Sequence, residues 1–278
     1  MLRFTLLLLL LIVLISVGSA VAVYSYLSSG YEDVKITSPS SARTLSTGDI
    51  IGFQGKHGAH VWLGIPYAQA PVGELWWKAP LRALPWEGRK EMLNYGFQCP
   101  QLPVVPNIGT DKAFVGAEDC LRLNVLAPTY DKDGVLTADE ALLVMFWIHG
   151  EGNSVGDGGS DLSQIYDGPM MATEHNVIAV SVNHRQGTLG WFFHDALRET
   201  SCSQKDASRN YGTLGLISAL GWLQENIAVF DGNPANVTIY GESAGGFNVL
   251  SLMASPLAKG LFHRAIVESG GLGISTKE

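Results

Sequence analysis

The chain has 278 residues, of which 46% are hydrophobic and 16% are charged, and its formal net charge is −8. That length is sufficient for one sizeable α/β domain with a buried core. The acidic balance, without any run of lysines and arginines, argues against a nucleic-acid-binding protein. We therefore expect no nucleic acid among its partners.

An apolar run occupies residues 6–23, and Arg3 is the only charged side chain before Glu32. The run suits either a cleaved signal peptide or a retained single-pass membrane anchor. A positive charge on its N-terminal side directs the rest of the chain out of the cytoplasm in both cases. We therefore expect a signal or anchor over residues 1–23, a polar linker over 24–48, and a periplasmic or extracellular location, either secreted or N-terminally membrane-anchored.

Three cysteines suit an exported chain, because disulfides persist in oxidising compartments. Counting alone leaves all three pairings of Cys99, Cys120 and Cys202 open. A bridge over a loop of about twenty residues stabilises a fold by roughly 3 kcal/mol.

The first half of the chain contains several strand-like runs. Residues 49–53 and 60–65 indicate a hairpin, and 121–126 alternates as a further strand. Two continuous apolar runs, 142–148 and 177–182, predict parallel strands that are covered on both faces.

In the second half, residues 211–230 carry apolar side chains at helical spacing. A strand at 237–240, a helical segment at 247–254 and a last short strand at 265–269 come after them. Strands that alternate with helices predict a mostly parallel, doubly wound α/β sheet.

The strongest functional motif is G-x-S-x-G, formed by Gly241, Glu242, Ser243, Ala244 and Gly245. The preceding strand and the following helix make it a candidate nucleophile elbow, in which the serine takes a strained backbone conformation. The two outer glycines let strand and helix approach closely. A bare G-x-S-x-G also occurs in ordinary turns. Whether this one is a nucleophile elbow therefore depends on the other motifs of the chain.

Two other motifs carry less weight. The glycines at 150, 152 and 156 follow a strand, but their spacing is one residue too long for a dinucleotide-binding loop. Residues 131–135 begin like a calcium loop, yet Val135 stands where an oxygen ligand is needed. We expect neither a cofactor nor a metal ion.

Several ordered motifs resemble the type-B carboxylesterases, the cholinesterase-like branch of the α/β-hydrolases. They are W-L-G-I-P-Y-A (62–68), E-D-C-L-R-L-N-V (118–125), W-I-H-G (147–150), S-V-N-H-R-Q-G (181–187) and the serine stretch (230–246). The resemblance extends from about residue 49 to the last residue. It implies an α/β-hydrolase fold and a serine carboxylic ester hydrolase that forms an acyl-enzyme with a small-molecule ester.

The resemblance also assigns roles to individual residues. Ser243 matches the nucleophile, and the backbone amides of Glu151, Gly152 and Ala244 match the oxyanion-hole donors. Ester cleavage passes through a tetrahedral intermediate with a negatively charged oxygen, which fixed N–H donors stabilise. The serine itself is a weak nucleophile and needs a base to accept its proton.

Other positions follow the family or depart from it. The resemblance implies a disulfide between Cys99 and Cys120, and the loop between them lacks the choline-binding tryptophan, so cholinesterase activity is not implied. Glu151 stands where the family usually has a glycine. A carboxylate at that position would oppose a developing oxyanion.

The triad order in this fold is serine, then acid, then histidine. His263 is the one histidine after Ser243, and it precedes a strand that is structural in the family. The other histidines are interpreted as loop, surface or packing residues: His57, His60, His149, His175, His184 and His194.

We therefore expect residues 49–278 to be the N-terminal portion of a carboxylesterase-type domain, truncated after the strand that follows the elbow helix. The isolated chain would then be incomplete, and a C-terminal complementing half would supply the acid and the histidine. The alternative is a non-catalytic, hydrolase-like binding protein.

Overall fold

The computed structural model describes residues 35–103, 114–129, 141–159, 168–199, 201 and 203–271. All the elements below belong to one unit, residues 36–278. The strands run in chain order as β1 (Thr37–Leu45), β2 (Gly48–Gln54), β3 (His60–Pro66), β4 (Arg89–Glu91), β5 (Arg122–Ala127), β6 (Leu142–Ile148), β7 (Ile178–Val182), β8 (Gly232–Glu242) and β9 (Arg264–Glu268).

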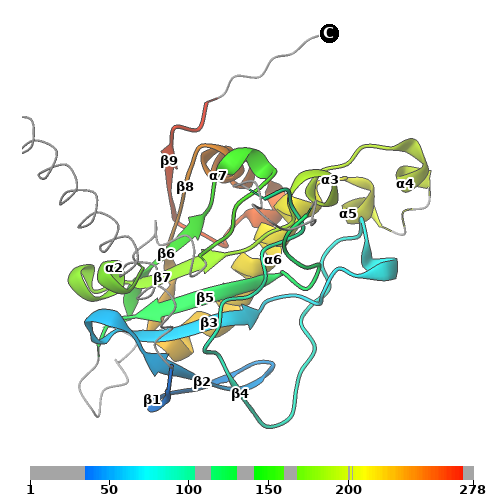
Figure 1. The fold of residues 1–278 in the computed structure, drawn as a ribbon. Coiled ribbons are helices and arrows are strands. Elements are labelled where there is room, and N and C mark those ends of the chain that lie inside the picture. The colour runs from blue at the N-terminus through cyan, green and yellow to red at the C-terminus, as the bar shows by residue number, and fades with distance from the viewer. Residues whose placement is uncertain are drawn as a thin grey trace, which may run out of the picture. The chain divides into compact units, whose positions relative to one another are not determined.

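These strands form one mixed sheet in the order β1-β2-β3-β5-β7-β6-β8-β9, with β4 beside β2 (Figure 1). Along this order, each strand from β1 through β2, β3 and β5 to β7 is antiparallel to the next. The remaining neighbours, β7–β6, β6–β8 and β8–β9, are parallel. The expected hairpin is confirmed, because β2 and β3 are antiparallel with Phe53 opposite Val61. The two continuous apolar runs are neighbouring parallel strands, as their composition predicts.

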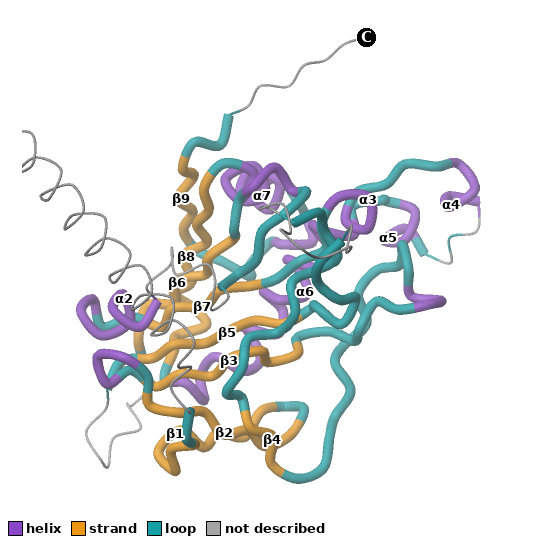
Figure 2. The backbone as a smooth tube through the Cα atoms, viewed as in Figure 1, coloured by secondary structure: helices purple, strands orange, loops and turns teal. Residues whose placement is uncertain are grey.

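Helices connect the strands and flank the sheet (Figure 2). The α-helices are α2 (Gly168–His175), α3 (Gly187–Gly190), α4 (Asp195–Glu199), α5 (Gln204–Ala207), α6 (Tyr211–Asn226) and α7 (Ala244–Ala254). The short 3-10 turns are η1 (Lys56–Gly58), η2 (Gly73–Leu75), η4 (Glu151–Asn153), η5 (Ile227–Phe230) and η6 (Pro256–Ala258).

Side chains that alternate along the strands pack into two separate hydrophobic cores. Val125 and Val180 belong to the larger core, which includes buried apolar side chains of α6 and α7 such as Leu220 and Val249. Their chain neighbours Leu126 and Ala179 belong to the smaller core, together with Ala172 of α2. Successive strand residues point to opposite faces, so helices cover both faces and the sheet is doubly wound.

The first strand corrects one expectation. Residues 37–45 lie within the range expected to be a polar linker, but they form β1 and pair with β2. Their polar groups are accommodated by hydrogen bonds. Ser41 Oγ lies 2.8 Å from His60 Nδ1, and Trp62 Nε1 donates to the Ser41 carbonyl oxygen at 2.7 Å. A strand made of serine and threonine has weak apolar alternation, which is why its composition alone suggested a linker.

Some expectations concern residues that the structure does not describe. The expected signal or anchor at residues 1–23, the calcium-like segment 131–135 and Cys202 all lie outside the described ranges. Within those ranges, none of the helices combines the length and the hydropathy that crossing a bilayer requires.

Candidate active site

Ser243 lies at the sharp junction between β8 and α7, where the sequence predicts the elbow. Its backbone has φ 57° and ψ −118°, a region that residues other than glycine rarely adopt. Close packing holds it there: a Cβ added to Gly245 would lie 2.1 Å from the Ile148 carbonyl oxygen, and one on Gly241 would lie 2.6 Å from Gly245. The elbow therefore fits only glycines at its two outer positions.

Ala244 opens α7 immediately after the serine. Phe247 N donates to the Ser243 carbonyl oxygen at 3.1 Å and closes the first helical turn. The amides in that first turn have no partner inside the helix, and the helix dipole places partial positive charge there. The arrangement suits the binding of a negatively charged oxygen above Ser243.

The second half of the site is the turn η4, which follows β6. Glu151, Gly152 and Asn153 have φ values of 65°, 68° and 55°, so the turn consists of three consecutive left-handed residues. Gly150 brings this turn against the elbow, because a Cβ added there would lie 3.3 Å from Ser243 Cβ and 2.6 Å from the Glu242 carbonyl oxygen. The structure thus places the predicted oxyanion-loop residues beside the predicted nucleophile.

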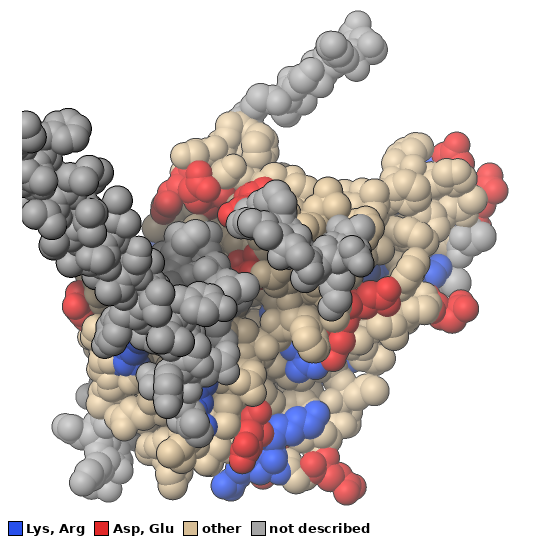
Figure 3. Space-filling model, in the orientation of Figure 1, with Lys and Arg blue, Asp and Glu red and all other residues tan. Residues whose placement is uncertain are grey.

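Acidic side chains gather around the ends of β8 and β9 (Figure 3). Glu242 and Glu268 are register partners on these two strands, and both are exposed, as is Glu151 in the neighbouring turn. In the part of the chain that the structure describes, no group of three or more histidine, cysteine, aspartate or glutamate residues is arranged to hold a metal ion.

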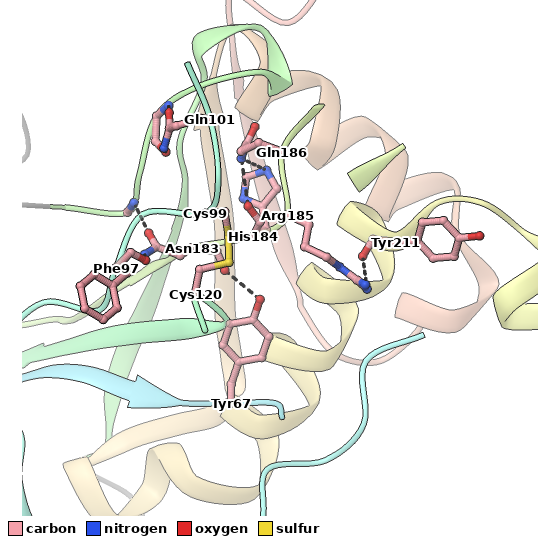
Figure 4. The surroundings of a disulfide bond; sticks show 12 residues. Tyr67, Phe97, Cys99, Gln101, Cys120, Asn183, His184, Arg185, Gln186 and Tyr211 are labelled. Atoms are coloured by element: carbon pink, nitrogen blue, oxygen red, sulfur yellow. Dashed lines mark hydrogen bonds between the residues drawn. A yellow bond between two sulfur atoms is a disulfide. The ribbon is translucent and has the colours of Figure 1, made fainter. Parts of the chain in front are cut away.

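A buried polar cluster lies next to the turn, and the sequence reasoning missed it. The rings of His149 and His184 lie 4.5 Å apart, and Gln186 Nε2 lies 3.2 Å from His149 Nε2. The same Gln186 nitrogen lies 3.1 Å from His184 Nε2 (Figure 4). Asn248 Nδ2 of α7 approaches the same His184 nitrogen at 3.3 Å. These residues meet only in three dimensions, since they follow three different strands.

Burial determines the charge state of the two histidines. Desolvation lowers the pKa of His149 to about 4, against the opposing attraction of Asp157. Desolvation also lowers the pKa of His184 well below its usual value, and the neighbouring His149 adds to this effect. Both rings are therefore neutral at pH 7 and serve as hydrogen-bonding groups.

No histidine in the described ranges forms a hydrogen bond with Ser243. His263 Nδ1 accepts a hydrogen bond from Val237 N at 3.2 Å, and His60 is held by Ser41. These contacts engage His263 and His60 with residues other than Ser243.

The disulfide Cys99–Cys120 is present, with the two Cα atoms 5.0 Å apart (Figure 4). The residues on either side of Cys99 contact the segment after η4. Gln101 Nε2 donates to the Gly156 carbonyl oxygen at 2.9 Å, and Gln98 Nε2 donates to Asp157 Oδ2. The covalent link therefore supports the chain segment that leads away from the oxyanion-loop turn.

Comparison with known proteins gives consistent results. A family model described as the carboxylesterase family matches residues 39–275. The para-nitrobenzyl esterase of Bacillus subtilis (strain 168) is 40% identical over 223 residues, which is 80% of this chain and 42% of that protein. Carboxylesterase 1D of Rattus norvegicus is 41% identical over 219 residues, covering 76% of this chain and 35% of the relative.

Solved structures agree with the sequence relatives. A thermophilic PNB esterase superimposes with a TM-score of 0.71 at 38% identity, covering 83% of this chain and 44% of that one. An esterase from the anaerobe Clostridium hathewayi, described as hydrolysing aliphatic aromatic polyesters, gives a TM-score of 0.71 at 34% identity, covering 86% and 45%. The chain spans less than half the length of these relatives.

Proposed function

Because the chain belongs to the carboxylesterase family, we propose that it carries the nucleophile and the oxyanion hole of a serine carboxylic ester hydrolase. The expected α/β-hydrolase fold is confirmed by the superposition on solved esterases. The observation that carries the proposal is the left-handed backbone of Ser243 at the junction of β8 and α7. A strained serine between a parallel strand and a helix N-terminus is the arrangement that exposes a nucleophilic hydroxyl.

In the proposed reaction, Ser243 Oγ attacks the carbonyl carbon of an ester. The amides of Glu151, Gly152 and Ala244 donate hydrogen bonds to the oxygen that becomes negatively charged, and the alcohol leaves with a proton. Water then attacks the acyl group on Ser243 and releases the acid. Each fixed donor of this kind is worth about 10²–10³ in rate.

Both steps need an imidazole to move protons. Since none of the described histidines bonds Ser243, we assign the base and its acidic partner to the part of the family fold by which the relatives exceed this chain in length. This part would be supplied by a continuation of the same reading frame or by a second chain. The substrate class is a small carboxylic ester, in line with the esterase names of the relatives.

We further propose that the protein functions outside the cytoplasm. The disulfide Cys99–Cys120 needs an oxidising compartment to persist, and the apolar run at residues 6–23 follows a single positive charge, as in export signals. Whether the run is cleaved or retained as an anchor would be read from the N-terminal sequence of the exported protein.

The experiment compares the chain alone with the chain supplied with the C-terminal part of a relative, such as the para-nitrobenzyl esterase. A fluorophosphonate probe and a short-chain nitrophenyl ester report on the nucleophile and on turnover. We expect both signals only in the complemented form, and Ser243→Ala to abolish them. Ser251→Ala is the matched control, because Ser251 is an exposed serine on α7 whose hydroxyl bonds the Phe247 carbonyl oxygen at 2.9 Å.

Labelling at a residue other than Ser243 would remove the serine-hydrolase assignment. Absence of labelling in a folded, complemented protein would favour the non-catalytic binding protein instead. Turnover by the chain alone would mean that one of its own histidines acts as the base, and His263 would be the first to replace.

A further inference from the structure

The oxyanion-loop turn and the elbow helix are joined by a hydrogen bond between two asparagine side chains. Asn248 Nδ2 donates to Asn153 Oδ1 at 2.8 Å. Asn153 is the last residue of η4, and Asn248 lies in the second turn of α7 with 3% of its surface exposed. The bond therefore spans the two segments that carry the proposed oxyanion donors.

The orientation of the Asn248 amide follows from its surroundings. Its Nδ2 also lies 3.3 Å from His184 Nε2, and Gln186 Nε2 lies 3.1 Å from the same ring nitrogen. Gln186 Nε2 has a second acceptor in the His184 carbonyl oxygen at 3.1 Å. In the tautomer of His184 whose Nε2 is unprotonated, the single lone pair of that nitrogen accepts from Asn248 Nδ2, and the other amide hydrogen of Asn248 is left for Asn153.

The turn η4 needs such an external contact. Its three left-handed residues lie in a sparsely populated region, and Glu151 at φ 65° carries the largest side chain among them. Within the turn, the local support comes from Ser154, whose N and Oγ both lie 3.3 Å from the Glu151 carbonyl oxygen. Conformations of this kind persist where the surrounding structure fixes them.

We propose that Asn153 and Asn248 act as an amide clamp, a pair of positioning residues that holds the amides of Glu151 and Gly152 opposite the amide of Ala244. The inference rests on the proposed function, because it assigns the clamp to the oxyanion hole of that site. Neither asparagine touches the reacting atoms. The clamp acts by keeping one backbone conformation of the turn populated before the substrate binds.

The first test is independent of catalysis. Hydrogen–deuterium exchange is followed by mass spectrometry on the full chain and on its Asn153→Ala and Asn248→Ala variants. We expect the peptide covering 150–156 to exchange roughly five- to tenfold faster in both variants, as expected for one lost hydrogen bond. The peptides of β6 and β8 should keep their wild-type rates.

Asn153→Asp is the matched control, because a carboxylate oxygen still accepts the hydrogen bond from Asn248 Nδ2. It should restore wild-type exchange at 150–156, whereas Asn153→Leu, which keeps most of the side-chain volume but has no hydrogen-bond acceptor, should exchange as fast as Asn153→Ala. Wild-type exchange at 150–156 in both alanine variants would overturn the clamp. Equal acceleration in all peptides would also overturn it, because the effect would then be global unfolding. Asn153 is only part-buried, so its variants are expected to fold even where Asn248→Ala is strongly destabilised.

The second test connects the clamp to the site. In the complemented form, the rate constant for fluorophosphonate acylation should fall about tenfold in Asn153→Ala, while the probe concentration at half-saturation stays unchanged. Asn153→Asp keeps the acceptor but adds a negative charge near the developing oxyanion, so it should recover the exchange protection more fully than the acylation rate. If the complemented wild-type protein were not labelled, the proposed function would be refuted. The hydrogen–deuterium exchange experiment alone would then test the amide clamp. Labelled wild-type protein with an unimpaired Asn153→Ala variant would refute the positioning role alone.

Discussion

The backbone amide of Ser243 donates a hydrogen bond of 2.8 Å to the carbonyl oxygen of Glu268. The residue in the strained elbow is therefore anchored to the last residue of β9, which is the outermost strand of the described sheet. The position of the serine depends on the integrity of this edge as well as on β8 and α7.

The edge itself is apolar and open. Ile266 and Val267 of β9 are 44% and 36% exposed, and an exposed apolar edge strand is a template for aggregation. We predict that Ile266→Lys raises the solubility of the chain and lowers its light scattering. Leu84→Lys is the control, because Leu84 is 66% exposed but lies outside the strands. Equal behaviour of the two variants would show that aggregation does not begin at β9.

Two glycine-to-alanine substitutions should have opposite effects on stability. A methyl group on Gly245 would lie 2.1 Å from the Ile148 carbonyl oxygen, so we expect Gly245→Ala to lower the free energy of unfolding by at least about 3 kcal/mol. A Cβ added to Gly221 of α6 would meet open space, so Gly221→Ala should raise the free energy of unfolding by about 0.5–1 kcal/mol. Urea unfolding of both variants checks this. A mild effect of Gly245→Ala would mean that strand and helix can separate at the elbow.

The buried histidines predict how stability depends on pH. The pKa of His149 is about 4 in the folded chain, against an ordinary histidine value of 6.5, so the unfolded chain binds more protons between these values. Stability should therefore be fully present above about pH 6.5 and fall as the pH decreases towards 4, by about 3 kcal/mol for this residue. The lowered pKa of His184 acts in the same direction.

His149→Gln isolates this contribution. Urea unfolding at several pH values should show a weaker loss of stability between about pH 6.5 and 4 in the variant than in the wild-type chain. The comparison at neutral pH measures the packing cost of the replacement, since both histidines are neutral there. If the variant and the wild-type chain showed the same pH dependence, His149 would have to become accessible to water before its ring binds a proton.

Glu151 predicts a gain of activity upon substitution. The residue combines a left-handed backbone, which favours glycine, with a carboxylate near the proposed oxyanion. In the complemented form, Glu151→Gly should raise the rate constant for ester cleavage. Glu151→Gln removes the charge and keeps the side chain, so it separates the electrostatic effect from the backbone effect. A lower activity in both variants would give the carboxylate a positive role.

The sequence was informative where a local pattern determines the structure. The continuous apolar runs became the parallel strands β6 and β7, and G-x-S-x-G became a strained strand–helix junction, because glycine spacing encodes close approach directly. The disulfide partners followed from a family signature and not from spacing.

The rest of the site depends on contacts between distant segments. Asn153 and Asn248 are separated by 95 residues, and neither lies in a pattern that marks it as functional. The polar composition of β1 concealed a strand, because the groups that bond its buried serine, Ser41, lie on β3. Such hydrogen-bond partners emerge only when the sheet order is known.

The order of the sheet also constrains biosynthesis. β6 (Leu142–Ile148), one of the most apolar segments of the fold, pairs with β7 and β8, which both follow it in the chain. On the ribosome, this segment therefore emerges without either of its neighbours, and its pairing is not complete until residue 242 has been synthesised. Long-range parallel pairing is slow and leaves nascent segments open to misassembly. A holdase chaperone, or an export apparatus that keeps the nascent chain unfolded, would protect β6 during that interval.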